Sequence, residues 1–165
     1  MKTARTALHG GALFVALLLT FSSCAWSGDW SLKDKEGVRY TLSGMHGRWV
    51  LVNFWAPWCP VCIHEFPEFI SLQKENRDLQ VIGVAVMYQN RREVLDMVQS
   101  QAISYPIVFG NEDTAGDFGG IVGLPTSFLY SPSGKLVGKH SGPLTKDEIG
   151  QAIEGKPEAA ALFTR

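Results

Sequence analysis

The feature that most constrains the fold is a strongly apolar run that ends close to a pair of cysteines. Residues 49–55 read WVLVNFW, in which Asn53 is the single polar interruption. A run of this kind is typical of a strand buried on both faces. Residues 59–62, CPVC, follow after a short gap, and a helical pattern begins there. The stretch predicts a buried strand, a loop, and a helix whose first turn carries both cysteines.

The order of apolar patterns along the rest of the chain indicates an α/β fold. A strand, a helix and a second strand in succession form a parallel βαβ unit. The elements expected from periodicity and turn residues are a strand at 38–42, a helix at 60–76, a strand at 80–86, a helix at 91–101, a short strand at 107–109, a hairpin of 127–130 with 135–139, and a helix at 145–154. They predict a central mixed β-sheet flanked by helices.

Length and charge limit the organisation and the partners. The 165 residues suffice to bury one ordinary core, so one domain is expected. A net charge of -1 without runs of like charge gives no electrostatic reason to expect nucleic-acid binding. We expect a tether at residues 24–29, the domain at 30–156, and a loosely held tail at 157–165.

The first residues have the pattern of a secretory signal peptide. Lys2 and Arg5 precede an apolar stretch at 8–21, and two serines follow it. The stretch is shorter than the ~20 residues that a membrane-spanning helix needs. A retained anchor is the alternative, because no charge appears before Asp29. We expect residues 1–23 to be a cleaved signal, and the mature protein to face the periplasm or an equivalent compartment that permits disulfides.

Cys24 lies at the end of this segment. FSSC resembles a bacterial lipobox, in which the cysteine becomes the lipidated first residue, although Phe21 stands where leucine is usual. An ordinary signal-peptidase cut after Ala25 is the alternative. We favour lipidation of Cys24 and attachment to a membrane, because an odd cysteine in an exported protein has no other evident use.

Cys59 and Cys62 have the spacing of a working redox pair. A helix N-terminus presents unpaired N–H groups and a partial positive charge, so a cysteine there is stabilised as the thiolate. A second cysteine one turn later can break the mixed disulfide that forms with a substrate. We therefore expect Cys59 to attack and Cys62 to resolve, with Trp58 partly covering the exposed sulfur.

Other uses of a C-x-x-C pair fit less well. A structural zinc site needs two further Cys or His ligands, and His46, His64 and His140 are not paired in the sequence. A c-type haem site needs histidine directly after the second cysteine, where Ile63 stands. A purely structural disulfide of this spacing closes too small a loop to stabilise much. No metal and no cofactor is expected.

Three segments carry the motifs of a known family in the same order. They are VLVNFWAPWCPVCIHEFPEF at 50–69, YPIVF at 105–109 and GLPTSFLYSPSGKLV at 123–137. They resemble the thioredoxin superfamily and, more closely, its exported TlpA/ResA/CcmG-like disulfide reductase branch. The resemblance covers roughly residues 30–154. It implies a thioredoxin-like fold and a thiol-disulfide oxidoreductase that reduces disulfides in exported client proteins.

The resemblance also implies a substrate-binding surface around the cysteines. It makes Pro125 a cis-proline that faces the two sulfurs, although the residues alone equally permit a turn proline. The backbone of Leu124 is then implied to pair with a substrate strand. Trp58 and Pro60, on either side of Cys59, are expected to contact the same substrate.

Glu65 is the candidate for proton transfer. It matches the acidic residue in the pattern C-x-x-C-x-x-E-x-P and shares a helix face with Cys62. The resemblance implies that Glu65 relays a proton to or from that sulfur, whereas the residues alone favour a solvated surface glutamate. Asn53 stands where cytoplasmic thioredoxins have a buried aspartate, so that proton-handling group is missing. Asn53 is equally well explained as a partner of a neighbouring backbone group.

The nearest alternative activity is a disulfide oxidase or isomerase of the DsbA type. Its CPHC motif has a histidine that helps to stabilise the thiolate, and Val61 offers no such group, so a more reducing couple is expected here. A peroxiredoxin-type thiol peroxidase needs a threonine where Ala56 stands. A Sco-type copper chaperone needs cysteines four positions apart. A reductase must be re-reduced, and the resemblance implies a membrane thiol donor of the DsbD/CcdA kind.

Overall fold

The computed structural model describes residues 28–163. Their elements are, in chain order, β1 (Ser31–Lys33), β2 (Arg39–Thr41), the 3₁₀ helix η1 (Ser43–Met45), β3 (Trp49–Trp55), α1 (Pro60–Glu75), β4 (Leu79–Ala85), α2 (Arg91–Ser100), β5 (Ile107–Phe109), α3 (Glu112–Gly116), β6 (Thr126–Tyr130), β7 (Leu136–Ser141), α4 (Lys146–Ile153) and α5 (Pro157–Ala160). The predicted signal peptide, Cys24 and most of the predicted tether lie outside the described residues. Within residues 28–163, no helix is long and apolar enough to cross a membrane.

The larger sheet has five strands in the order β5-β4-β3-β6-β7. β3 pairs in parallel with β4, and β4 pairs in parallel with β5. On the other side β3 pairs antiparallel with β6, which forms a hairpin with β7. The predicted βαβ unit and terminal hairpin therefore join in one mixed sheet, with β3 at its centre.

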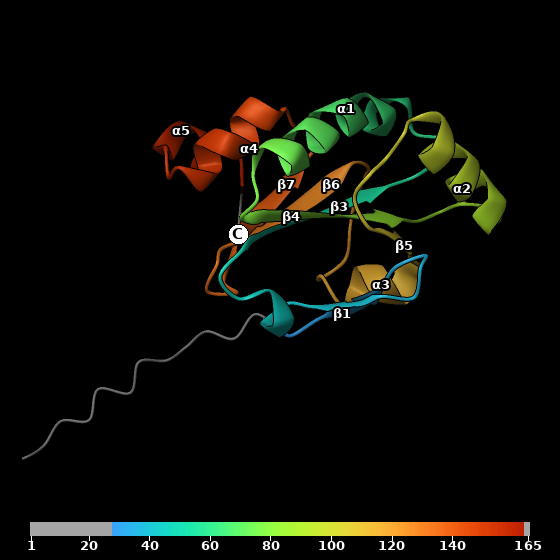
Figure 1. Ribbon diagram of the computed structural model, residues 1–165, viewed down its shortest axis with the longest axis horizontal. Coiled ribbons are helices and arrows are strands. Elements are labelled where there is room, and N and C mark those ends of the chain that lie inside the picture. The colour runs from blue at the N-terminus through green and yellow to red at the C-terminus, as the bar shows by residue number, and fades with distance from the viewer. Residues whose placement is uncertain (1–27, 164–165) are drawn as a thin grey trace, which may run out of the picture.

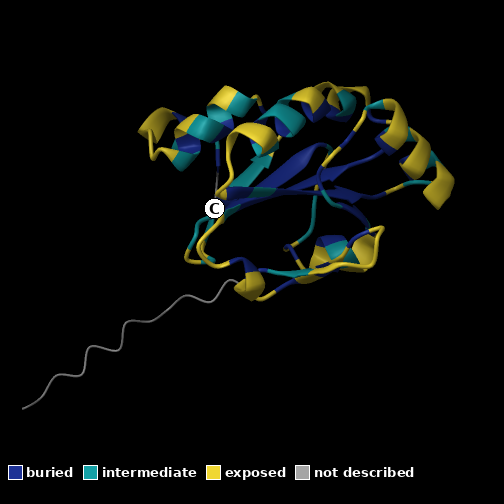
Figure 2. Ribbon diagram, in the orientation of Figure 1, coloured by how far each residue is buried: buried dark blue, intermediate teal, exposed yellow. Residues whose placement is uncertain are grey.

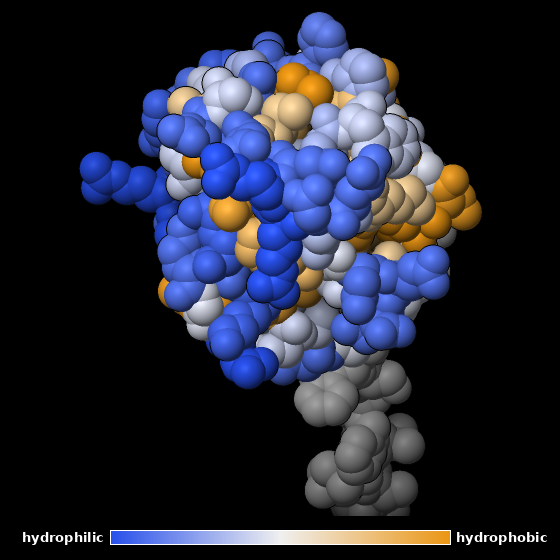
Figure 3. All heavy atoms as spheres, turned by 90° about the vertical axis from the view of Figure 1, so that its right-hand side faces the viewer, coloured by the Kyte–Doolittle hydropathy of each residue, from blue (hydrophilic) through white to orange (hydrophobic). Residues whose placement is uncertain are grey.

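The apolar run of β3 is explained by cores on both faces of the sheet. Leu51 and Trp55 belong to the core beneath α1, whereas Val52 and Phe54 belong to the core on the opposite face. In Figure 1 the helices α1, α2, α4 and α5 lie above the sheet, and α3 with β1 lies below it. Figure 2 shows the central strands buried and the outer faces of the helices exposed. The face in Figure 3 is mostly hydrophilic, with apolar residues in separate patches.

The end of the described chain corrects the prediction of a loose tail at 157–165. α5 forms there, and Ala159 and Phe163 are buried in the core beneath α1. Phe163 packs on β7 at Gly138, where an added Cβ would approach the Phe163 backbone to 2.7 Å. The segment is too short to display a periodicity, so its docking depends on this tertiary contact.

Two further short elements lack a sequence signal and were not predicted. β1 pairs antiparallel with β2 and buries Leu32 in the core opposite α1. α3 is capped by Asn111, which exchanges hydrogen bonds with Thr114 in a capping box. Both elements lie below the sheet in Figure 1, and α3 lines a pocket next to the one that contains Cys59.

Candidate active site

The two cysteines lie where β3 gives way to α1. Cys59 is the N-cap of α1, and its Sγ accepts a hydrogen bond from the backbone N–H of Cys62 at 3.3 Å. Pro60 occupies the first helical position, where its missing N–H costs nothing. Cys59 and Cys62 form a disulfide with their Cα atoms 5.3 Å apart. The sequence order of strand, loop and helix thus places both sulfurs in the first turn of the helix.

The two sulfurs differ in accessibility. Cys62 is fully buried at 0% exposure, whereas Cys59 is 5% exposed and lines a pocket of ≈ 190 Å³. Trp58 forms another part of this pocket and is itself largely exposed. A molecule that approaches from solvent therefore meets the sulfur of Cys59 and not that of Cys62.

Trp58 is held by a contact with the loop after β4. Its indole Nε1–H donates a 2.7 Å hydrogen bond to the carbonyl oxygen of Met87. Met87 also lines the pocket beside Cys59. The tryptophan is thus fixed as a wall of the pocket, next to the sulfur it was expected to cover.

The loop before β6 forms the opposite part of the pocket. The peptide bond between Leu124 and Pro125 is cis, as the resemblance implied, and Leu124 lines the pocket with Cys59. Among residues 28–163, neither the N–H nor the C=O of Leu124 has a hydrogen-bond partner. Pro125 is buried. The structure therefore brings together four of the residues expected at the substrate-binding surface, Trp58, Pro60, Leu124 and Pro125, around Cys59.

Glu65 is buried, so the interpretation as a solvated surface glutamate is wrong. Its side chain is 2% exposed on the inner face of α1. Oε1 accepts a 2.7 Å hydrogen bond from the backbone N–H of Leu144, and Oε2 accepts a 3.4 Å hydrogen bond from Asn53 Nδ2. Burial raises the pKa of Glu65 to about 8, and these two hydrogen bonds only partly oppose that shift. At neutral pH the carboxyl group is mostly protonated.

The side chain of Asn53, on β3, hydrogen-bonds to two other side chains, those of Glu65 and Ser127, and not to a neighbouring backbone group. Its Nδ2 also donates a 3.0 Å hydrogen bond to Ser127 Oγ on β6. Its Oδ1 has no hydrogen-bond partner among the described residues, and the same holds for the buried hydroxyl of Tyr105. Burial, and then the charge of nearby Glu65, raise the pKa of Tyr105. A buried polar cluster of Asn53, Glu65, Tyr105 and Ser127 therefore lies within the core that contains the cysteines.

Sequence reasoning did not select Tyr105, Ser127 or Leu144 for this cluster. Tyr105 and Ser127 lie in the motifs that carried the resemblance, and Ser127 is a polar residue in a buried strand. A polar residue within a largely apolar strand is a signal that could have selected Ser127 from the sequence. Leu144 contributes only its backbone N–H, which no residue-type pattern can indicate. Within residues 28–163, no group of three or more His, Cys, Asp or Glu residues is arranged to hold a metal ion.

Residues 27–139 match the AhpC/TSA family. The chain belongs to this family. The relative named thiol-disulfide oxidoreductase ResA of Bacillus subtilis is 33% identical over 119 residues, which are 72% of this chain and 66% of the relative. The family match extends over β3, α1 and the loop before β6, where the cysteine pair and the cis-proline lie.

Solved structures of similar proteins have the same fold. A thiol:disulfide interchange protein of Chlorobium tepidum has a TM-score of 0.69 and 29% identity, over 77% of this chain and 92% of that one. The exposed lipoprotein thioredoxin of Streptococcus pneumoniae has a TM-score of 0.65 and 26% identity, over 78% and 99%. The predicted thioredoxin-like fold is confirmed. With the Cys59–Cys62 disulfide, these relatives also confirm the predicted activity class, a thiol-disulfide oxidoreductase.

Proposed function

We propose that this oxidoreductase reduces disulfides in exported client proteins, with Cys59 attacking and Cys62 resolving. The observation that carries this assignment is the asymmetry of the pair. Cys59 lies at the N-terminus of α1 and reaches a pocket, whereas Cys62 is fully buried. The helix N-terminus favours the thiolate at Cys59. Ala56, at the position where a thiol peroxidase needs threonine, is a buried side chain without a hydroxyl group.

The proposed exchange balances in two steps. The Cys59 thiolate attacks one sulfur of the client disulfide, forms a mixed disulfide and releases the other client sulfur as a thiolate. The Cys62 thiolate then attacks the Cys59 sulfur, which releases the second client thiolate and forms the Cys59–Cys62 disulfide. The client gains two electrons and two protons, and the protein loses them. A thiol donor must then return two electrons, which we assign to a membrane protein of the DsbD/CcdA kind.

Glu65, in its ionised form, is proposed to accept the proton that Cys62 loses when it attacks, and in its protonated form to return one. It lies three residues after Cys62 on the same buried face of α1. Its pKa of about 8 is close to that of an ordinary thiol, so a proton moves between the two groups at little cost. Asn53 is proposed to hold the carboxyl group in place through its side-chain hydrogen bond.

The loop before β6 is proposed to hold the client as an extended strand. The free N–H and C=O of Leu124 are suited to pair with a client backbone, as at an unpaired sheet edge. Pro125 sets the position of this loop beside Cys59, and Trp58 and Pro60 complete the contact surface. Backbone pairing of this kind accepts many client sequences, as a general reductase requires.

We further propose that residues 1–23 are a signal peptide and that lipidated Cys24 attaches the protein to a membrane on its extracytoplasmic side. The similarity to an exposed lipoprotein of Streptococcus pneumoniae supports this assignment. Mass spectrometry of the mature N-terminus tests it. A diacylglyceryl-modified Cys24 is the expected result, and an unmodified N-terminus at Trp26 would contradict it. A Cys24→Ala variant is expected to lose the modification.

The direction of electron flow is tested by the reduction potential of the Cys59–Cys62 couple. The purified protein is equilibrated against glutathione and against a stronger dithiol buffer, and the free thiols are counted. A potential near that of thioredoxin, about −270 mV, is expected for a reductase. A potential near that of DsbA, about −120 mV, would instead identify an oxidase.

A further inference from the structure

Among the described residues, four of the six large apolar side chains that are exposed lie beside the reactive sulfur. Six large apolar residues are exposed among the described residues: Val38, Trp58, Val61, Met87, Leu95 and Val122. Trp58 directly precedes the CPVC turn, Val61 lies within it, and Met87 and Val122 line the pocket that contains Cys59. Val122 is 91% exposed and Met87 is 63% exposed. Apolar exposure concentrated at one site marks a surface that a partner covers.

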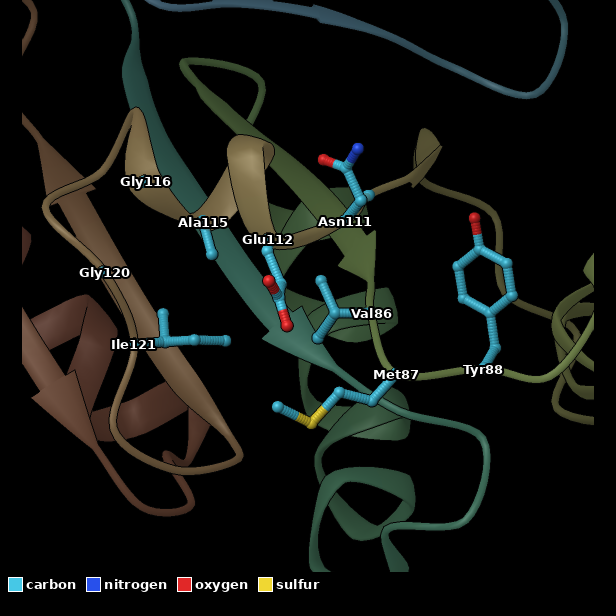
Figure 4. Close-up of a pocket in the computed structure, with 10 residues that line it drawn as sticks. Val86, Met87, Tyr88, Asn111, Glu112, Ala115, Gly116, Gly120 and Ile121 are labelled. Atoms are coloured by element: carbon cyan, nitrogen blue, oxygen red, sulfur yellow. The ribbon is translucent and has the colours of Figure 1, made fainter.

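A second pocket lies next to the pocket that contains Cys59, beside α3. It has a volume of ≈ 580 Å³ and is lined by apolar side chains, including Val86, Met87, Ala115 and Ile121. Figure 4 shows Val86, Met87 and Ile121 directed toward a common space, with the carboxylate of Glu112 beside them. The side chain of Asn111 is engaged in the capping box of α3. The pocket is thus mainly apolar, with one acidic group at its edge.

The two pockets are adjacent, because Met87 and Ile121 line both of them. We call the two adjacent pockets together the groove: one pocket contains Cys59 and Leu124, and the other reaches α3. A polypeptide whose disulfide lies at Cys59 therefore has a path along the groove. An extended chain advances about 3.3 Å per residue, so the side chains that follow the client cysteine can lie along the groove.

Met87 is held in an unusual conformation at the junction of the two pockets. Its φ is +54°, in the left-handed region that a non-glycine residue adopts at a cost of about 1 kcal/mol. The hydrogen bond from the Trp58 indole to its carbonyl oxygen ties this loop to the active site. A flexible thioether exposed at such a position suits contact with varied apolar groups.

We propose that the pocket beside α3 is a client subsite that takes a large apolar side chain of an extended client segment, a few residues from the cysteine being reduced. This inference rests on the proposed function and adds a specificity to it. The position next to the Cys59 pocket and the apolar lining favour a Leu-, Met- or Phe-sized side chain. Glu112 disfavours an acidic side chain at the same place.

The test uses a series of peptides whose single cysteine is disulfide-bonded to glutathione. Each peptide carries Leu, Ala or Asp at one position within four residues of the cysteine, and the second-order rate constant for its reduction is measured in a single turnover with reduced protein. At one of these positions we expect the Leu peptide to be reduced about tenfold faster than the Ala peptide, because the subsite buries a side chain of that size. Equal rates for Leu and Ala at every position would overturn the subsite.

Gly116→Leu is the variant that tests the location. An added Cβ at Gly116 meets no atom within 4 Å, and Gly116 lines the pocket, so a leucine there is expected to occupy part of it. In this variant the ratio of the rate constants for the Leu and Ala peptides is expected to fall to about one. Gly150→Leu, the same change in equally open space on α4, is the matched control and retains the preference. A preference that persists in Gly116→Leu would place the subsite elsewhere.

A second variant keeps the test decisive if Gly116→Leu does not fold. Glu112 is an exposed residue at the pocket, and Glu112→Lys is expected to raise the rate for Asp peptides relative to Ala peptides by up to about fivefold. Glu158→Lys on α5 makes the same charge change elsewhere and leaves the ratio unchanged. An unchanged ratio in Glu112→Lys would contradict the subsite. Failure of the wild type to reduce even the all-alanine peptide would instead contradict the proposed function.

Discussion

The backbone N–H of Leu144 donates a 2.7 Å hydrogen bond to the carboxylate of Glu65, 79 residues earlier in the chain. The bond joins the helix that carries the cysteines to the segment that leads into α4. It also gives the buried carboxyl group a fixed orientation within the core. The group proposed to exchange a proton with Cys62 is therefore held by the C-terminal part of the fold.

The raised pKa of Glu65 predicts a pH-dependent stability of the oxidised protein. The pKa is about 8 in the folded state against 4.5 for an ordinary glutamate, so the folded state binds this proton more tightly. The contribution of Glu65 to the free energy of unfolding is then greatest below about pH 4.5. It falls as the pH rises toward 8, by at most about 5 kcal/mol. Glu65→Gln is expected to flatten this decline. Urea unfolding at a series of pH values measures this decline. The disulfide form is used because its two cysteines do not titrate.

Glu75→Gln is the matched control for this measurement. Glu75 lies on the same helix, is exposed, and has a pKa lowered by hydrogen bonds from Ser71 and Lys146. Its titration therefore falls below the pH window of interest. In Glu75→Gln the free energy of unfolding is expected to fall between pH 5 and 8 as it does in the wild type. If the same fall also persists in Glu65→Gln, Glu65 is not its source.

The different exposure of the two cysteines predicts different single-variant behaviour. Cys59→Ser is expected to abolish client reduction, because the buried Cys62 cannot reach a client disulfide. Cys62→Ser is expected to accumulate Cys59–client mixed disulfides, because nothing resolves them. Non-reducing gels and mass spectrometry of the protein from its native compartment detect these adducts. A reversed pattern, with adducts in Cys59→Ser, would exchange the two roles.

The proposed proton transfer predicts a change in the pH profile of client reduction. With reduced protein, Glu65→Gln is expected to slow resolution of the mixed disulfide by tenfold or more and to remove the dependence on a group of pKa near 8. Stopped-flow measurements across pH 6 to 10 record both effects. His64→Gln, at the adjacent exposed position, is the control and keeps the wild-type profile. An unchanged profile in Glu65→Gln would restrict this residue to a structural role.

The docked C-terminal segment predicts a loss of stability when its anchor is removed. Phe163→Ala is expected to lower the free energy of unfolding by about 3 kcal/mol, because a buried aromatic ring is lost. Gly138→Ala is expected to destabilise as well, since its Cβ would overlap the Phe163 backbone. Gly150→Ala on α4 meets open space and is expected to be neutral or slightly stabilising. Chemical denaturation distinguishes these outcomes, and a neutral Phe163→Ala would indicate a loosely held segment.

The long elements around the cysteines were predictable from local pattern alone. β3 and α1 begin and end within one residue of their predicted limits, and Thr145 with Glu148 caps α4 as expected. Such elements carry their own signals, since a long apolar run, helical spacing and a capping pair each depend on neighbouring residues. The spacing of Cys59 and Cys62 likewise needed no tertiary information to indicate a redox pair.

Tertiary structure decided the features that depend on residues distant in sequence. β1, α3 and α5 are too short to show a period, and they form because Leu32, Ala115 and Phe163 are buried against the sheet. Glu65 has the sequence pattern of a surface residue, and only its position beneath Leu144 and Asn53 makes it a buried acid with a raised pKa. The sequence determined the reactive pair, whereas packing determined its surroundings, because burial depends on contacts between segments far apart in the chain.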